Sequence, residues 1–226
     1  MSTPAKSHLA LAVLLAAGML AGCSRSPIEV IKDPLKIETR YIEDATDRTT
    51  IPLGEDEEAI TKWKFGCRAD IDFDITSKEI VDPNYIVSIK VTGVRMRLDA
   101  PVTIWVSKDS PAETLKHEQA HALICSRVYK NADSIARQAA RTVLGNSYQA
   151  SGKTLDAACK AAVDRVAEEV CELYHLKAVE SINRVSEVFD GLEQHDMGKT
   201  PEQMVDTAFS QYVDITEKRP ERQEDK

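Results

Sequence analysis

Apolar and polar residues alternate along much of the first half of the chain, which is the pattern of half-buried β-strands. Between residues 24 and 47 proline and charge interrupt the alternation, which predicts a tether with one strand, followed by a polar loop. Turn signals at Asp82-Pro83-Asn84 and Asp99-Ala100-Pro101 separate three further runs with strand character, at residues 64–76, 85–98 and 102–106. We expect these runs to form an antiparallel meander with one buried face.

The spacing of apolar residues lengthens from two to nearly four after Pro111, so the second half of the chain should be helical. Ser110 as N-cap and Pro111 in the first turn mark the start of the first helix. The second helix should end at Gly145-Asn146, where a left-handed cap forms easily, and a loop should follow. The third and longest helix carries an apolar stripe that must pack against other helices. The expected helices span about 110–130, 133–144, 154–192 and 201–213, and the expected loop spans 147–153.

The N-terminus indicates the compartment. Lys6 precedes an apolar run at residues 9–20, which is shorter than the roughly 20 residues of a membrane-spanning helix and is typical of a signal peptide. The run ends in Leu20-Ala21-Gly22-Cys23, which resembles the lipobox of bacterial lipoproteins. The resemblance implies that residues 1–22 are removed and that Cys23 becomes a lipid-modified N-terminus, anchored through its acyl chains. An uncleaved signal anchor, or ordinary secretion with a chance cysteine, is the alternative.

The anchored protein should lie in the bacterial cell envelope. Ser24, where some lipoproteins have aspartate, resembles the sorting signal for the outer membrane, so we expect a protein that faces the periplasm. Residues 23–58 would form the lipidated tether and first strand, residues 59–215 one folded domain, and residues 216–226 a charged, disordered tail. The net charge of -8, without a basic patch, argues against nucleic acid as a partner and leaves Cys23 as the contact with the membrane.

Four cysteines follow Cys23, and an even number in an oxidising compartment predicts two disulfides. They are Cys67, Cys125, Cys159 and Cys171. The last two should lie on one helix about 18 Å apart, beyond the reach of a disulfide, so each should pair with one of the first two. Because the sequence contains no Cys-x-x-Cys pair, a structural zinc site made of cysteines is disfavoured.

The chemistry of the chain is carried by His117-Glu118-Gln119-Ala120-His121. Residues four apart on an α-helix point the same way, so His117 and His121 can bind one Zn²⁺ ion per chain. Glu118 is then placed to act as general base on the attacking water and as general acid toward the leaving amine. Strands followed by a helix with this motif are typical of zincin-like metallopeptidases, so the expected fold class is α+β. In such enzymes an edge strand binds the extended substrate, and we expect residues 102–106 to be that strand.

The third metal ligand is less well defined by the sequence. Residues 189–196 read Phe-Asp-Gly-Leu-Glu-Gln-His-Asp. Together with the HEQAH helix, this segment resembles a family of bacterial envelope and secreted zinc-dependent protease-like domains, in which HEQ-x-H is followed much later by Tyr-Asp-x-x-Thr-x-His-Gly. The resemblance covers residues 115–195, keeps Asp190 and His195, and departs at Phe189, Glu193 and Asp196.

The resemblance implies that His195 is the third ligand and that Asp190 orients a ligand histidine from behind. His175 is an alternative ligand, and so is a carboxylate of the long helix, as in gluzincin-type peptidases. The carboxylates concerned are Glu168, Glu169 and Glu172.

Three functions follow from this pattern. The first is hydrolysis of peptide bonds in protein or peptide substrates of the envelope. The second is a noncatalytic envelope lipoprotein with a binding or assembly role. The third is zinc-dependent hydrolysis of another amide, such as one in peptidoglycan.

Overall fold

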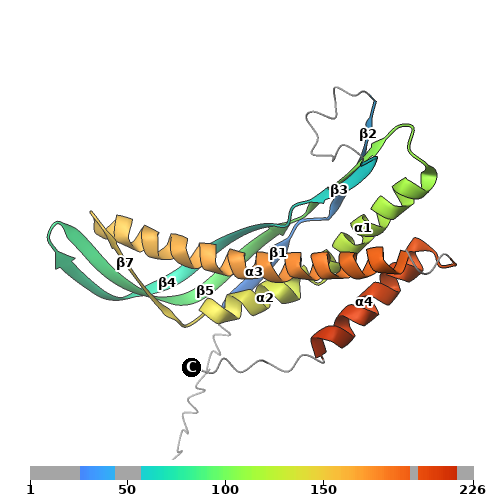
Figure 1. The fold of residues 1–226 in the computed structure, drawn as a ribbon. Helices are drawn as coiled ribbons and strands as arrows, with labels where there is room; N and C mark the ends of the chain where they lie inside the picture. Colours follow the sequence, from blue (N-terminus) through green and yellow to red (C-terminus); the bar gives the residue numbers. More distant parts are fainter. Residues whose placement is uncertain (1–25, 44–56, 194–197, 218–226) are drawn as a thin grey trace, which may run out of the picture.

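The structure is a computed structural model that describes residues 26–43, 57–193 and 198–217. The expected signal peptide, the expected lipidation site at Cys23, the candidate ligand His195 and the tail after residue 217 lie outside the described residues. The fold is mixed α+β, with four helices and two mixed sheets (Figure 1). The strands are β1 (Ile28–Lys32), β2 (Lys36–Ile42), β3 (Ala59–Trp63), β4 (Gly66–Val81), β5 (Asn84–Asp99), β6 (Pro101–Ser107) and β7 (Ser147–Gly152). The helices are α1 (Ala112–Lys130), α2 (Ala132–Val143), α3 (Leu155–Glu193) and α4 (Pro201–Glu217).

The two sheets meet at Ala100, between β5 and β6. One sheet has the order β1-β5-β4, with β7 pairing the first half of β5, and the other has the order β2-β6-β3. The β4–β5 hairpin is antiparallel, as expected, and the β3–β6 pair is antiparallel too, although no strand was expected at residues 59–63. The β1–β5 and β2–β6 pairs are parallel. The expected antiparallel meander is confirmed for β4 and β5 but is wrong for residues 102–106, because β6 pairs with β2 and β3 in the second sheet instead of with β5. The error arose because the N-terminal segment supplies two strands, one to each sheet, where the sequence suggested a tether with one.

Two local predictions also fail. Residues 147–152 form β7 instead of a loop, because Tyr148 and Ala150 turn toward the rest of the fold while the polar residues between them face solvent. Ser110 does not cap α1: its Oγ lies 3.3 Å from the carbonyl oxygen of Glu58, and the residue before the helix is Pro111. The end of α2 is as predicted, since Gly145 adopts a left-handed conformation with φ of 82°.

The long helix α3 runs along the molecule and contacts both of its ends (Figure 1). Its N-terminal half lies against β7 and the far half of the β4–β5 hairpin, where a small cluster of buried residues includes Val87, Ile89 and Ala162. Its C-terminal half packs with α1, α2 and α4 over the main core, which contains the fully buried Tyr174 and Phe189. The predicted apolar stripe of α3 is therefore confirmed as a packing surface.

A disulfide between Cys67 and Cys171, with Cα atoms 5.6 Å apart, joins β4 to the middle of α3. This pairing is one of those expected. The expected second disulfide is absent, because Cys125 is buried in α1 and Cys159 lies half-buried near the start of α3, each as a free thiol. None of the helices in the described part of the chain combines the length and apolar character needed to cross a membrane.

Candidate metal centre

The two histidines of the motif lie one turn apart on α1 and turn their rings toward the C-terminal end of α3. Their Nε2 atoms are 3.0 Å apart, and the His117 and His121 side chains are 28% and 18% exposed. Solvent can therefore reach both rings, although each has one side against protein. The i, i+4 spacing of the sequence is sufficient to produce this arrangement.

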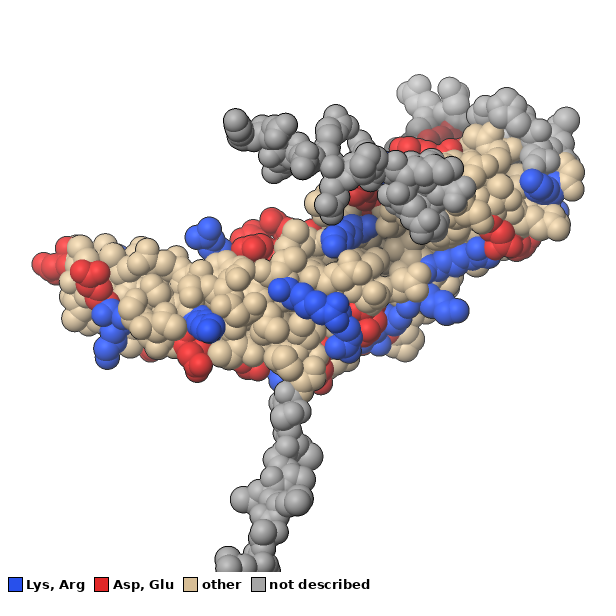
Figure 2. Space-filling model, turned by 90° about the horizontal axis from the view of Figure 1, so that it is seen from below, with Lys and Arg blue, Asp and Glu red and all other residues tan. Residues whose placement is uncertain are grey.

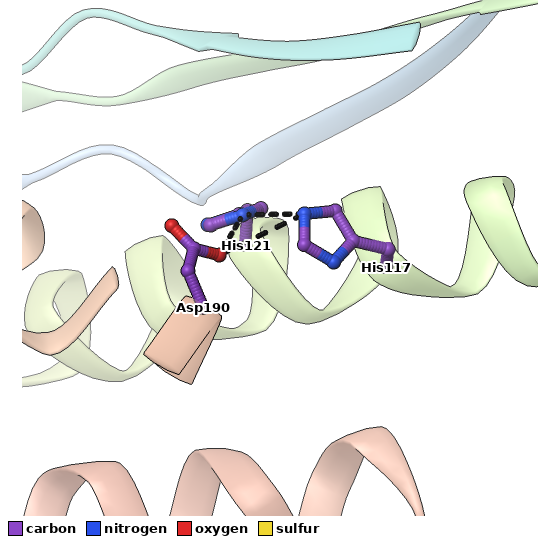
Figure 3. Close-up of side chains that lie close together, drawn as sticks. All are labelled: His117, His121 and Asp190. Atoms are coloured by element: carbon purple, nitrogen blue, oxygen red, sulfur yellow. Dashed lines mark hydrogen bonds and ion pairs between the residues drawn. The ribbon is translucent and has the colours of Figure 1, made fainter. Parts of the chain in front are cut away.

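Asp190 from the last turn of α3 completes a three-residue cluster (Figure 3). Its Oδ1 lies 3.1 Å from His121 Nε2 and 3.8 Å from His117 Nε2. Although 49% of the Asp190 side chain is exposed, Oδ1 itself is buried and makes no hydrogen bond. A buried carboxylate oxygen without a hydrogen-bond donor, aimed at two imidazole nitrogens, has the environment of a metal ligand.

The size of the cluster fits a small divalent ion. A circle through three atoms separated by 3.0, 3.1 and 3.8 Å has a radius of about 2.0 Å, close to the bond lengths of about 2.0 to 2.2 Å that zinc makes with imidazole and carboxylate. Two imidazoles and one carboxylate are a donor set for zinc and also for non-haem iron. The three donor atoms thus lie close enough together to hold a small metal ion.

Two neighbours on α3 support the histidines. Ser186, one turn before Asp190, places its Oγ 3.2 Å from His121 Nδ1. If Nδ1 donates to that hydroxyl, Nε2 keeps its lone pair for a metal. Phe189 is fully buried, with its ring centroid 5.4 Å from that of His117 and 5.3 Å from that of His121, so it closes the protein side of the cluster.

Glu118 is directed toward β3. It is only 8% exposed, and Thr61 Oγ1 lies 2.6 Å from its Oε2 and 3.0 Å from its backbone carbonyl oxygen. Thr61 donates its single hydroxyl proton to one of these acceptors at a time. The general base expected from the sequence is therefore tied to β3, which in the described chain pairs only with β6 and forms an edge of its sheet.

The prediction that residues 102–106 form the substrate-binding edge strand is wrong. The predicted strand at residues 102–106 is β6, which lies in the centre of its sheet with β2 on one side and β3 on the other. Among the described strands β3, which contacts the motif helix through Thr61 and Glu118, has a free edge. A central strand is typically buried on both flanks, and its short apolar run could not be told from an edge strand by sequence alone.

The remaining candidate ligands on α3 are not brought to the cluster. At a rise of 1.5 Å per residue, His175 lies about 22 Å along the helix from Asp190, and the glutamates lie about 27 to 33 Å away. These glutamates are Glu168, Glu169 and Glu172. His175 is half-buried, with its Nε2 unpaired, and is not part of the cluster. The structure thus brings Asp190, which was expected to orient a ligand histidine from behind, to the Nε2 atoms of both histidines, whereas His195 lies outside the described residues.

The helix that carries the histidines is fixed at its far end by β1. Lys32 Nζ donates to the backbone oxygens of Tyr129 and Lys130 at 3.1 and 3.2 Å, which satisfies carbonyl groups that a helix end leaves free. The Tyr129 hydroxyl lies 2.7 Å from the carbonyl oxygen of Asp33 and 3.0 Å from that of Leu98. These bonds fix α1 relative to the β1-β5-β4 sheet, and the Cys67–Cys171 disulfide fixes α3 to β4.

Charged residues of both signs are mixed on the surface. Figure 2 shows Lys and Arg side chains interspersed with Asp and Glu over the face seen from below. This face therefore carries no strong field of one sign.

No protein-family model, curated protein or solved structure matches the chain. The function is therefore inferred from the residues of the site.

Proposed function

We propose that the chain is a zinc-dependent peptidase of the bacterial cell envelope, zincin-like in type and anchored through a lipid on Cys23. The observation that carries the proposal is the convergence of His117 Nε2, His121 Nε2 and Asp190 Oδ1, from two helices, with separations of 3.0 to 3.8 Å. His117 and His121 also belong to a motif whose second residue, Glu118, is the general base in zinc peptidases.

Each residue has a separate task in this mechanism. His117, His121 and Asp190 would hold the ion, which when bound would supply Lewis-acid polarisation of the scissile carbonyl and lower the pKa of water toward neutrality. Glu118 accepts the proton from the attacking water on Oε1 and later transfers it to the leaving amine. Thr61 holds Oε2, which limits rotation of the carboxylate.

Substrate binding follows from the position of β3. Its free edge among the described strands lies beside α1, and Thr61 links the two elements. An extended peptide that adds to this edge passes next to the metal cluster, which favours a polypeptide substrate.

One observation favours a second candidate, a noncatalytic metal-binding lipoprotein. Glu118 is buried and its carboxylate already has a hydrogen-bond partner, as a residue that only ties α1 to β3 would have. In this case Glu118 has no role in bond cleavage, and the metal stabilises the fold or a partner's binding site.

Metal analysis and one conservative variant separate the two candidates. The peptidase should contain one zinc per chain and cleave casein or a peptide library, and Glu118→Gln should retain zinc but lose activity by about 10² to 10⁴-fold. Glu113→Gln, an exposed acid in the first turn of the same helix, is the matched control and should leave the rate unchanged. Protein that binds no metal, or cleavage that survives in Glu118→Gln, would contradict the proposal. Activity on peptidoglycan fragments alone would indicate hydrolysis of another amide.

A further inference from the structure

Strand β2 has an apolar face that should be buried but is not. Ile37, Thr39 and Tyr41 are in register with three residues of β6 on the side of the sheet that faces α1. Those β6 partners are 1 to 2% exposed, and they are Val102, Ile104 and Val106. Ile37 and Tyr41 are 48% and 57% exposed, so the inner face of β2 extends beyond the helix that covers β6.

A hollow of about 900 Å³ lies under this overhang, between β2, the flank of α1 and the start of α4. Its walls include Ile37, Leu123 and Pro201. The outer edge of β2 is also free, since β6 is the one strand that pairs with it in the described chain. An open strand edge with an uncovered apolar face is the combination found where another strand is added.

The sequence of β2 is complementary to itself in antiparallel orientation. If two copies pair with Thr39 opposite Thr39, then Ile37 lies opposite Tyr41 and Glu38 opposite Arg40, twice each by symmetry. Aromatic–β-branched pairs and opposite-charge pairs directly across a strand boundary are both favourable. The apolar pairs form on the inner face and the charged pairs on the outer face.

Other registers of the same pairing are unfavourable. A shift of two residues one way places Glu38 opposite Glu38, and the other way it places Arg40 opposite Arg40. A shift of one residue pairs inner-face with outer-face residues. By contrast, the long free edge of β4 carries three exposed acids on one face, which repel an identical strand. These are Asp70, Asp72 and Asp74.

We propose that the protein forms a two-fold symmetric dimer in which β2 of each copy pairs antiparallel around Thr39. The two three-stranded sheets then become one continuous sheet, and the Ile37 and Tyr41 side chains of both copies cover the hollows. Such self-complementarity is what a two-fold interface requires, because each patch must meet its own copy.

The dimer does not depend on the proposed catalytic function. The α1 residues that line the hollow, such as Lys116, Gln119 and Leu123, lie on the side of the helix opposite His117 and His121. The free edge of β3 stays accessible in the dimer, so a peptidase and a noncatalytic protein could both assemble in this way.

A cysteine at the symmetry axis tests the interface directly. Paired antiparallel residues have Cα atoms about 4.5 to 5.5 Å apart, within disulfide range, so Thr39→Cys should yield a covalent dimer on oxidation. The experiment uses the full chain in its membrane, with Cys159→Ser to remove the accessible thiol, and Asp74→Cys on the β4 edge as control. A dimer band no stronger than that of the control would overturn the proposal.

Charge exchange in the Thr39→Cys background tests the register. Glu38→Arg and Arg40→Glu each place like charges opposite one another and should reduce cross-linking about tenfold. The combined exchange restores opposite charges and should restore the dimer. Since both side chains are exposed, circular dichroism should show an unchanged fold. Equal cross-linking in the single and combined variants would refute the proposed register.

Discussion

Asp190 differs from the other two residues of the cluster because it offers a carboxylate oxygen and comes from a different helix. Replacing it by asparagine keeps the shape but removes the charge, and Asp190→Asn should weaken zinc binding by about 10² or more. Ser186→Ala removes the partner of His121 Nδ1 and should weaken zinc binding by about 10- to 100-fold. Competition with a chromophoric chelator measures both changes.

Glu187→Gln is the matched control for these variants, because Glu187 is an exposed acid on the same turn of α3. Its zinc affinity should equal that of the parent protein. Unchanged affinity in Asp190→Asn and Asp190→Ala would mean that the third ligand lies elsewhere, with His195 as the next residue to substitute.

Cys125 makes stability depend on pH above neutrality. Burial raises the pKa of its thiol from the ordinary 9.0 to about 12, and burial also raises the pKa of Tyr129 from 10.0 to about 12. Between pH 9 and 12 the unfolded chain loses these protons while the folded chain retains them, so the free energy of unfolding should fall as pH rises. Below pH 9 both groups are protonated in the folded and the unfolded state, so their contribution to the free energy of unfolding is fully present.

Urea denaturation in a chelator at several pH values from 8 to 11 measures this dependence. Cys125→Ala should reduce the slope by up to about 1.4 kcal/mol per pH unit, whatever it does to stability at pH 8. The same change at the half-buried Cys159 is the control. An unaltered slope in Cys125→Ala would show that its thiol titrates alike in both states.

Among the helices and strands, those with strong periodicity could be predicted from the sequence. The four helices lie within a few residues of their expected bounds, because their apolar stripes repeat over many turns. The β4–β5 hairpin follows from alternation around Asp82-Pro83-Asn84. Short elements such as β2 and β7 have too few apolar residues for a period to be recognised.

Pairings between distant elements could not be predicted from local pattern. The parallel β1–β5 and β2–β6 pairs depend on how the N-terminal segment crosses the two sheets. For the same reason the sequence identified His117 and His121 as neighbours, but not the contact of Thr61 with Glu118 or of Ser186 with His121. These contacts join residues that are 57 and 65 positions apart and carry no spacing signal.

The described part of the molecule is elongated, with the cluster of His117, His121 and Asp190 at one end. The β4–β5 hairpin, β7 and the start of α3 form the other end, around their own small core (Figure 1). A metal bound at the cluster would join α1 to the last turns of α3. The Cys67–Cys171 disulfide lies about 28 Å along α3 from Asp190, so it does not restrain these last turns. Metal should therefore stabilise this end selectively.

Removing the metal with a chelator should raise amide hydrogen exchange in α1 and in residues 182–192 of α3, and leave exchange in β7 and the hairpin unchanged. A ligand at about 1,000 times its dissociation constant stabilises the folded state by about 4 kcal/mol, so restored zinc should raise Tm by several degrees. Asp190→Ala should show no response to zinc, because it lacks the donor that connects α3 to the histidines. A uniform change in hydrogen exchange along the chain would contradict this prediction. It would mean that metal binding is coupled to folding of the whole domain and not only to the packing of α3 on α1.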